Sequence, residues 1–420
     1  MMVVDKKGGS MLRGKEIILG VTGGIAAYKS VELLRELTRR GSNVHVVMTK
    51  NATQFVTPLT FQTLSGNPVI SDLFKLLEGS KIGHIALADV AHLLVIAPAT
   101  ANIIGKIANG IADDFLTTMV MATRVPVLFA PSMNTKMWES PFVQQNIEKL
   151  KSFGYQFIGP QIGDLACGSK GRGRIADIED IVEKMEDIFT KKDLKGYKFI
   201  ITSGPTHEAI DPVRYITNRS TGKMGYALAI TAKRRGAEVI LIAGQSYLPP
   251  PTNDMKVIRV FTAKEMRDKV IENFKWCDAV IKAAAVADFR PSTIQNEKIK
   301  KEGGKYFLEL EKNPDILKEL GEIKKEHQIL VGFAAETSRH IDNAIKKLKE
   351  KKLDLIIAND VTLEGAGFGY DTNIVDIIDA TGKVKSLPLM SKMEIANIIL
   401  DQILRIFKKK GREKPWPQIW

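Results

Sequence analysis

Cysteine is scarce in this sequence, which has only two in 420 residues. Cys167 and Cys277 are 110 positions apart, and although they could form one disulfide in principle, two unrelated thiols in a reduced chain fit this usage better. Histidine is also rare, with six residues, and no cluster of Cys and His has the spacing of metal ligands. The sequence therefore argues against a disulfide-rich secreted domain and against a structural zinc site.

Long apolar runs are absent as well. The most apolar segments, 17–21, 93–97 and 353–358, have the length of strands and not of membrane spans. The first residues lack the basic end, apolar stretch and small-residue cleavage site of a signal peptide, so we expect a cytoplasmic protein without membrane contact. The 44% hydrophobic and 26% charged content is that of a globular protein, and this length suits two domains of about 200 residues each.

The net charge of +13 is shared unevenly between the two halves. Residues 1–190 carry 20 Lys+Arg against 18 Asp+Glu, whereas the remainder carries 41 against 30, which gives +2 and +11. A basic second half could attract nucleic acid, but it lacks interleaved aromatic residues and any known reading motif. We therefore expect no nucleic-acid partner, because attraction of polyanionic small molecules explains the charge at least as well.

The order of apolar runs predicts two successive α/β domains. Strands of a first set alternate with helices such as 25–40, and the set is followed by a glycine-rich stretch at 161–174 and a charged helix at 180–192. Its expected strands are 16–23, 43–49, 92–97, 125–130 and 155–159. Because strands and helices alternate, we expect a doubly wound parallel sheet.

The same pattern restarts at residues 195–196, which places the domain boundary near residue 190 and predicts domains 1–190 and 191–420. The expected strands of the second domain are 198–202, 238–243, 256–260, 279–285, 329–334 and 353–358. A hairpin of 373–379 and 383–387 and an amphipathic helix at 391–408 close the chain.

The first strand leads into a turn of small residues, from Gly20 to Lys29, before a helix begins. Such a turn lets backbone N–H groups meet a phosphate at the positive end of the helix, although glycines in these turns also serve packing. The turn is not a GxGxxG fingerprint, and Thr49 stands where a dinucleotide site has an acidic residue after the second strand. A mononucleotide is therefore favoured over NAD.

Other polar residues of this half have ordinary structural explanations when each is taken alone. Thr100 and Asn102 follow a strand and could bind a cofactor or cap a helix, and Asn134 could be a turn residue. His84 could be a surface or core histidine. Cys167 could be an inert small residue, although its glycine-rich surroundings argue against a packed position.

Taken together, the motifs GGIAAYK, HIAL, PATAN, PSMN and ACG resemble the homo-oligomeric flavin-containing cysteine decarboxylases, and among them phosphopantothenoylcysteine decarboxylase. The resemblance implies a flavodoxin-like flavoprotein domain with FMN bound near Gly23, Gly24, Thr49, Thr100 and Asn102. It further implies that FMN oxidises the substrate thiol so that the sulfur can accept the electrons released with CO2. The implied roles are base for His84, substrate binding for Met133 and Asn134, and proton donor for Cys167.

The second half contains the motifs SGPT, DPVRYITNRSTGKMG, AAAVADF, EKIKK, KNPDIL, VGFAAET and NDV. Each motif could also have a purely structural role, since a polar glycine-containing loop can cap a helix and a lysine run is usually a solvated face. Their order resembles phosphopantothenate–cysteine ligase, and the whole chain is similar to the bifunctional fusion of decarboxylase and ligase. The expected fold is thus two doubly wound Rossmann-like domains, the second a nucleotide-binding ligase domain.

The ligase resemblance implies that CTP activates the carboxylate of 4′-phosphopantothenate as an acyl-cytidylate, which the amine of cysteine then attacks. Asn218 would hold this intermediate and Lys298 would act during its formation. The implied CTP site consists of Asp288, Pro314, Asp315, Ile316, Leu317, Phe333, Lys347 and Lys351. Mg²⁺ would accompany the triphosphate, held largely by phosphates and water, with protein ligands unassigned.

Three other functions compete with this interpretation. An NAD(P)-dependent reductase is disfavoured by the missing GxGxxG, and a purely regulatory second half is disfavoured by Asn218 and Lys298. The flavin half could act on another substrate, such as a peptide's C-terminal cysteine, but the fused ligase supplies an obvious one. The resemblance also implies a homo-oligomer, with trimeric flavin domains and dimeric ligase domains that could combine into a dodecamer.

Overall fold

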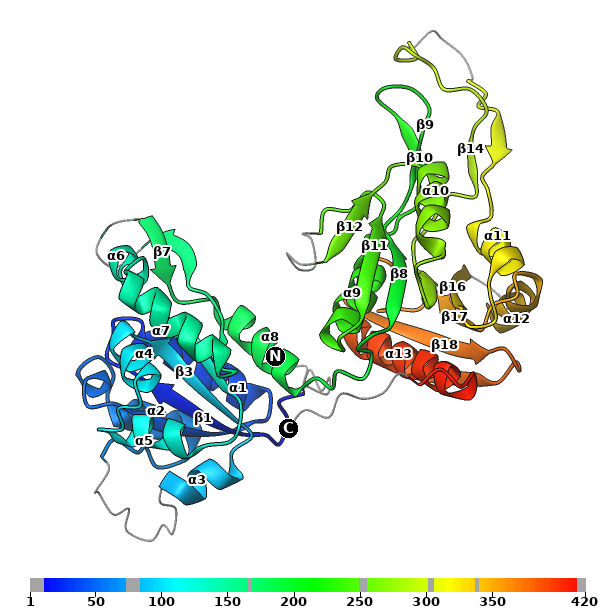
Figure 1. Cartoon of the computed structure of the whole chain (residues 1–420). Helices are drawn as coiled ribbons and strands as arrows, with labels where there is room; N and C mark the ends of the chain where they lie inside the picture. The colour runs from blue at the N-terminus through cyan, green and yellow to red at the C-terminus, as the bar shows by residue number, and fades with distance from the viewer. Residues whose placement is uncertain are drawn as a thin grey trace. The chain divides into compact units, whose positions relative to one another are not determined.

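The computed structural model describes residues 11–72, 84–164, 168, 170–248, 255–300, 306–336 and 340–413. The chain forms two compact units, which meet in the sequence between Thr190 and Lys191 (Figure 1). Each unit has its own central sheet and its own buried apolar clusters. No helix in the described part of the chain is long and apolar enough to span a membrane.

The first unit is built on a five-stranded parallel sheet in the order β2-β1-β3-β4-β5. Its strands are β1 (Glu16–Val21), β2 (Asn43–Met48), β3 (Leu93–Ala99), β4 (Val127–Pro131) and β5 (Gln156–Phe157). This is the flavodoxin-like order, which reverses direction between β1 and β3. The expected doubly wound α/β fold is confirmed.

Helices cover both faces of this sheet, so the strands are apolar on both sides. In β1, Ile17 and Leu19 pack against one set of helices and Ile18 against the other. The first set contains α1 (Ala27–Arg39), α2 (Pro58–Ser65) and α8 (Ile178–Phe189). The second contains α3 (His84–Val90), α4 (Ala101–Ala108), α5 (Phe115–Ala122) and α7 (Pro141–Ser152), with the short α6 (Thr135–Trp138) following β4.

The glycine-rich stretch at 161–174 is not merely a loose loop, because its two ends pair as an antiparallel hairpin of β6 (Gln161–Asp164) and β7 (Lys170–Arg174). A Cβ atom on Gly173 would lie 2.1 Å from the carbonyl oxygen of Met133, and one on Gly171 would lie 2.3 Å from Thr135 Oγ1. The glycines therefore let β7 lie directly on the segment that follows β4.

The second unit has an eight-stranded sheet in the order β12-β11-β8-β13-β16-β17-β18-β19. The first six strands in this order are parallel, and the last two add an antiparallel hairpin. Their bounds are β8 (Lys198–Ser203), β11 (Glu238–Ala243), β12 (Lys256–Arg259), β13 (Ala279–Lys282), β16 (Ile329–Glu336), β17 (Leu355–Asp360), β18 (Thr372–Asp379) and β19 (Val384–Ser391). The parallel part has the Rossmann order 3-2-1-4-5-6, as expected for a nucleotide-binding fold.

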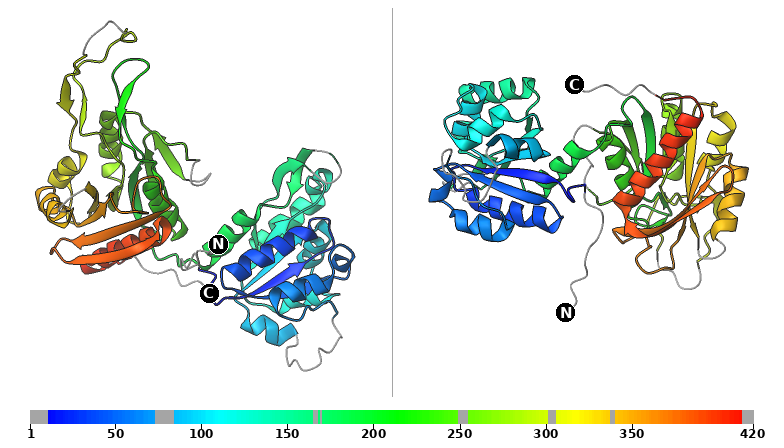
Figure 2. Two further views of the ribbon diagram at one scale, coloured as in Figure 1. Left: turned by 180° about the vertical axis from the view of Figure 1, so that it is seen from behind. Right: turned by 90° about the horizontal axis from the view of Figure 1, so that it is seen from below.

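Two short ribbons project from this sheet and were not expected from the sequence. One pairs β9 (His207–Ala209) with β10 (Tyr215–Thr217), and the other pairs β14 (Phe289–Pro291) with β15 (Leu310–Lys312). In Figure 1 both ribbons lie at the same end of the second unit, and the left view of Figure 2 agrees. Strand β13 is correspondingly shorter than expected, since it ends at Lys282 before the chain turns toward β14.

Helices also cover both faces of the second sheet (Figure 2). One face packs against α9 (Lys223–Arg234) and α13 (Lys392–Lys409), the other against α10 (Ala263–Phe274), α11 (Ile316–Ile323) and α12 (His340–Glu350). Helix α13 begins with a capping box of Ser391 and Glu394. Near its end, the fully buried Phe407 stacks on Tyr197 with ring centroids 4.5 Å apart.

Replacing Phe407 with Ala should destabilise the second unit, because it would leave a cavity beside Tyr197 and Phe199. The expected loss in unfolding free energy is about 3–5 kcal/mol. Urea unfolding followed by far-ultraviolet circular dichroism would measure it. Phe307→Ala is the matched control, since that ring is 87% exposed; equal midpoints for the two variants would contradict the packing described.

Candidate functional site

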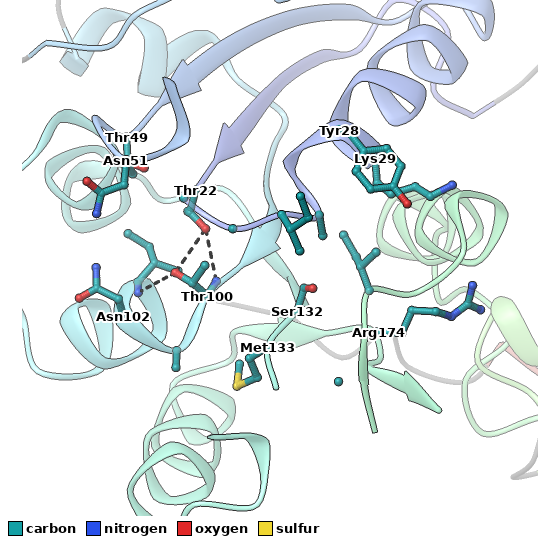
Figure 3. Close-up of a pocket in the computed structure, with 18 of the residues that line it drawn as sticks. Thr22, Tyr28, Lys29, Thr49, Asn51, Thr100, Asn102, Ser132, Met133 and Arg174 are labelled. Carbon is teal, nitrogen blue, oxygen red and sulfur yellow. Dashed lines mark hydrogen bonds between the residues drawn. The ribbon is translucent and has the colours of Figure 1, made fainter. Parts of the chain in front are cut away.

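The first unit contains a cavity of about 1120 Å³ at the carboxyl ends of β1 to β4. Neighbouring strands β1 and β3 send the chain to helices on opposite faces there, and such a point leaves a crevice that ligands commonly fill. Seven residues singled out in the sequence line it together: Gly23, Gly24, Thr49, Thr100, Asn102, Met133 and Asn134. Four of them, Thr49, Thr100, Asn102 and Met133, are labelled in Figure 3.

The turn after β1 is closely packed on one side and open on the other. A Cβ atom on Gly23 would lie 2.4 Å from Asn51 Cβ, so only glycine fits there. At Gly24 the nearest atom would be Thr100 Cγ2 at 3.4 Å, an ordinary contact, so the turn keeps open space beside it. No side chain caps the N-terminus of α1 at Ala26. The turn and the helix start thus present backbone at the cavity wall, as an anion site requires.

Two threonines connect strand ends beside the cavity, Thr22 after β1 and Thr100 after β3 (Figure 3). Thr22 Oγ1 donates to the carbonyl of Pro98 at 2.7 Å and accepts from the N–H of Thr100 at 3.3 Å. Thr100 in turn caps α4, since its Oγ1 accepts from the N–H of Ile103 at 3.4 Å. Thr100 is therefore a helix cap as well as a wall residue.

Thr49 differs from the other two threonines. Its Oγ1 is buried and has no hydrogen-bond partner among the described residues. A buried hydroxyl that lacks a partner costs roughly 1–3 kcal/mol, and such groups in native proteins usually have one. Because Thr49 lines the cavity, a polar ligand there would supply the missing hydrogen bond.

The far wall of the cavity is formed by the segment after β4 and by the hairpin. The N–H of Met133 donates to the carbonyl of Gly173 at 3.0 Å, and Asn134 Oδ1 accepts from the N–H of Lys136 at 2.8 Å. Asn134 therefore caps α6 besides lining the cavity. His84 begins α3, but its side chain lies outside the described part of the structure, and Cys167, between β6 and β7, lies outside the described residues.

The second unit has a smaller cavity, of about 250 Å³, at the carboxyl end of β13. Of the residues expected to bind CTP it gathers five, namely Asp288, Pro314, Asp315, Ile316 and Lys351. Lys351 Nζ lies 2.8 Å from Asp315 Oδ2, while Asp315 Oδ1 caps α11 by accepting from the N–H of Lys318. Burial alone would raise the pKa of Asp315, but the hydrogen bond and charge of Lys351 outweigh it and lower the pKa.

The remaining expected residues lie elsewhere. Leu317 is buried in the apolar cluster under α11, and Phe333 packs against the cluster on the opposite face of the sheet. Lys347 does not line the cavity, although its charge acts on a lysine that does. Asn218 Nδ2 donates to the carbonyl of Ala285 at 3.0 Å, which ties it to the loop between β13 and Asp288. Lys298 is exposed and outside the cavity wall.

The residue that the sequence did not reveal is Lys282, the last residue of β13. It follows three buried residues of a central strand and is itself half-buried at the cavity wall. Burial and the charge of Lys351 lower the pKa of Lys282 to about 8, with Lys347 acting in the same direction and Asp315 and Asp288 opposing. In the sequence, Lys282 is one lysine within the apolar strand predicted over 279–285, which precedes a predicted nucleotide loop.

No group of three or more His, Cys, Asp or Glu side chains placed to hold a metal ion occurs among the described residues. The buried Cys277 is a free thiol, and burial raises its pKa to about 12. A thiol of this kind stays protonated at neutral pH and is chemically inert.

The two units match two family models. Residues 6–190 match the family described as Flavoprotein, and residues 194–407 match the DNA/pantothenate metabolism flavoprotein C-terminal domain. "Coenzyme A biosynthesis bifunctional protein CoaBC" of Bacillus subtilis (strain 168) is 52% identical over 96% of this chain and 99% of its own length. The chain belongs to this family.

Other proteins of the same name are also similar to this chain. The protein of the same name from Escherichia coli (strain K12) is 43% identical over 96% of this chain and 99% of its own length. A crystal structure of the C-terminal domain of a protein of that name has 43% identity, a TM-score of 0.45, and covers 52% of this chain and 100% of its own. The prediction of a bifunctional enzyme of coenzyme A biosynthesis, with decarboxylase and ligase activities, is confirmed.

Replacing Lys282 with Met should stabilise the protein below pH 8, because it removes a charge that the site disfavours. The unfolded lysine keeps its proton to about pH 10.5, whereas the folded one loses it near 8. Between these values the unfolded state binds more protons, so the wild-type protein gains stability as pH rises. The advantage of the variant should therefore be largest at or below pH 8 and narrow toward pH 10.5.

Chemical unfolding of both proteins at pH 7 and pH 10 would measure this difference. Lys318→Met is the control, since Lys318 is exposed on α11, the helix that Asp315 caps. An advantage of the Lys282→Met variant that does not change with pH would contradict the depressed pKa.

Proposed function

We propose that the first unit binds FMN and decarboxylates 4′-phosphopantothenoylcysteine, and that the second unit makes this substrate from 4′-phosphopantothenate, cysteine and CTP. The observation that carries the proposal is the convergence of seven residues singled out in the sequence on one cavity in the first unit. Five of the residues expected to bind CTP line the cavity of the second unit. Each cavity stands at the carboxyl end of parallel strands, where α/β enzymes bind nucleotides.

The residues of the first cavity fit a flavin mononucleotide. The open turn at Gly24 and the uncapped start of α1 suit its phosphate, and the unpaired hydroxyl of Thr49 suits a polar group of the cofactor. Thr100 and Asn102, on the start of α4, would complete the polar wall. When bound, the flavin supplies a two-electron acceptor and donor, which cysteine decarboxylation needs because the carboxylate has no electron sink of its own.

The protein's own groups would then orient the substrate and move protons. Asn134, on the wall opposite the turn, would hold the substrate's carboxylate or amide, with Met133 beside it. His84 would be the base, because imidazole exchanges protons near neutral pH. Cys167, between the two strands of the hairpin, would return a proton to the product.

In the second unit the free carboxylate of 4′-phosphopantothenate would react poorly with an amine, because its oxygen is a poor leaving group. CTP would activate this carboxylate. The carboxylate oxygen would attack the α-phosphate of CTP, and this step would release pyrophosphate and form an acyl-cytidylate. The amine of cysteine then displaces CMP and forms the amide. Asn218, held against the loop after β13, would bind the intermediate, and Lys298 would act beside the phosphates. Asp288, Asp315 and Lys351 would surround the nucleotide.

Several further parts of the proposal stay predictions. These are Mg²⁺ as companion of the triphosphate, CTP contacts from Leu317, Phe333 and Lys347, a cytoplasmic location, and the homo-oligomer of trimeric flavin units and dimeric ligase units. Size-exclusion chromatography with light scattering would test the assembly, and dependence of pyrophosphate release on Mg²⁺ would test the metal.

Replacing Thr49 with Val should weaken FMN binding about 2- to 12-fold, because one net hydrogen bond contributes about 0.5–1.5 kcal/mol. Fluorescence titration of the apoprotein with FMN would measure the dissociation constant. Thr53→Val is the matched control, because its hydroxyl already donates to the carbonyl of Lys50 at 2.8 Å and does not line the cavity. Equal effects of the two substitutions would remove Thr49 from the flavin site.

The full reaction is tested by supplying 4′-phosphopantothenate, cysteine and CTP and detecting 4′-phosphopantetheine by mass spectrometry. We expect a yellow protein that releases pyrophosphate from CTP only when 4′-phosphopantothenate is present. In the Cys167→Ser variant the ligase product should still form, while the first unit stops at an oxidised intermediate. A colourless protein, or no amide product with any nucleotide, would contradict the proposal. Loss of both activities in the Cys167→Ser variant would contradict the assignment of decarboxylation to the first unit and ligation to the second.

A further inference from the structure

Lys282, the last residue of β13, brings a positive charge to the wall of the second cavity. Strand residues two apart share a face, so Lys282 lies on the same face as Val280, which packs under α10, α11 and α12. Within the described residues, its ammonium group has no hydrogen bond or ion pair. Lys351, in the same wall, differs because its ammonium group lies 2.8 Å from Asp315 Oδ2. Lys282 is therefore a donor that a ligand in the cavity would satisfy.

The cavity suits the nucleoside end of a nucleotide better than its phosphates. Its wall carries three lysines against two aspartates, a balance of one positive charge: Lys282, Lys312, Lys351, Asp288 and Asp315. Phosphate groups there would meet both carboxylates, and like charges repel. The volume of about 250 Å³ is also below the roughly 300–1,000 Å³ of pockets that enclose a whole small ligand. We therefore expect only the uncharged part of the nucleotide in this cavity.

The fold provides another place for the phosphates, beside this cavity. β8 is the first strand of the Rossmann order, and phosphates bind where that strand leads into its helix, here α9. No side chain caps α9 at Gly222. Asn218, just before α9, donates to the carbonyl of Ala285 at 3.0 Å, and residues 286–288 then line the cavity. A nucleotide with its α-phosphate near Asn218 would thus extend its nucleoside along this loop into the cavity.

The bases cytosine and uracil differ in the hydrogen-bonding groups of one edge. In cytosine the ring nitrogen N3 accepts and the exocyclic amine beside it donates, whereas in uracil N3 carries a hydrogen and O4 accepts. A lysine ammonium group only donates, and an ionised carboxylate only accepts. A wall with both groups matches cytosine and opposes uracil at each position. Such a mismatch discriminates strongly, because it leaves buried polar groups unpaired.

We infer that Lys282 is a specificity-determining residue of the ligase reaction, and that its ammonium group donates to N3 of the cytosine ring of CTP. Asp288, whose carboxylate has no hydrogen bond or ion pair within the described residues, accepts from the exocyclic amine. The inference rests on the proposed ligase function, because it names the part of the nucleotide that one cavity of that site reads. Lys282 is half-buried, so bulk water does not replace this contact freely.

The test measures kcat/KM for pyrophosphate release by the full-length protein, with 4′-phosphopantothenate and either CTP or UTP. In Lys282→Met the value with CTP should fall about 10- to 100-fold, because a hydrogen bond from a charged group is lost. The value with UTP should change by less than about threefold, because uracil offers no acceptor at N3. The substitution removes a charge that the folded site disfavours, so the variant should remain folded. ATP does not serve here, since adenine also presents an acceptor beside an amine.

A nucleotide without the ring nitrogen decides whether the contact is direct. The analogue 3-deaza-CTP has a C–H group in place of N3 and keeps the exocyclic amine. The wild-type protein should use it about 10- to 100-fold less well than CTP, and Lys282→Met should use the two equally well, because the contact is already absent. Lys318→Met is the matched control, since Lys318 is exposed on α11 and does not line the cavity. We expect this control to match the wild type with all three nucleotides.

The outcomes separate this inference from the function on which it rests. No pyrophosphate release by the wild-type protein with any nucleotide would refute the ligase function itself. Release with an unchanged preference for CTP over UTP in Lys282→Met would refute the role of Lys282 alone. An equal loss with CTP and UTP would also overturn it, because the lysine would then act by its charge on any nucleotide. The same holds for a loss with 3-deaza-CTP that persists in Lys282→Met.

Discussion

Two adjacent parallel strands that send the chain to opposite faces of a sheet leave a space between their ends that neither connection can fill. This constraint fixes the site in each unit of the chain. In the first unit it operates between β1 and β3, where Thr22 and Thr100 join the two strand ends. In the second unit it operates between β8 and β13, where Pro205 and Ala285 still pair after the strands have ended. The chain continues from Ala285 into the wall of the second cavity, which Val286, Ala287 and Asp288 line.

Around these cavities, backbone is positioned by groups that never need to touch a ligand. Gly23 lets the β1–α1 turn rest on Asn51, and Gly173 lets the hairpin rest on Met133. In the second unit Thr206 Oγ1 accepts from the N–H of Ala287, and Asn313 Nδ2 donates to the carbonyl of the same residue. Asp288 is the next residue, so the loop that carries it is fixed by hydrogen bonds to both Thr206 and Asn313. In each site, few side chains are expected to take part in the reaction, and many backbone contacts hold these side chains in place.

The sequence was sufficient to predict both central sheets, because their strands are apolar on both faces and separated by amphipathic helices. It did not predict the three short ribbons, since strands such as His207–Ala209 or Lys170–Arg174 have neither apolar alternation nor length. Motifs identified residues of both cavities, but motif membership does not say which face a side chain takes. Phe333 and Leu317 accordingly lie in apolar clusters. Lys282 was overlooked because its meaning depends on neighbours 6 to 69 positions away, which only the folded chain brings together.

The hairpin of β6 and β7 shows how the shape of a site can restrict a sequence away from its chemistry. A Cβ atom at Gly173 would lie 2.1 Å from the carbonyl oxygen of Met133, and one at Gly171 would lie 2.3 Å from Thr135 Oγ1. Strand β7 can therefore rest on the segment after β4 only where these two positions carry no side chain. A larger residue at either position would force the hairpin away from Met133 and change the outline of the cavity. Selection on these two glycines is thus selection on the width of the cavity, and not on any group that reacts.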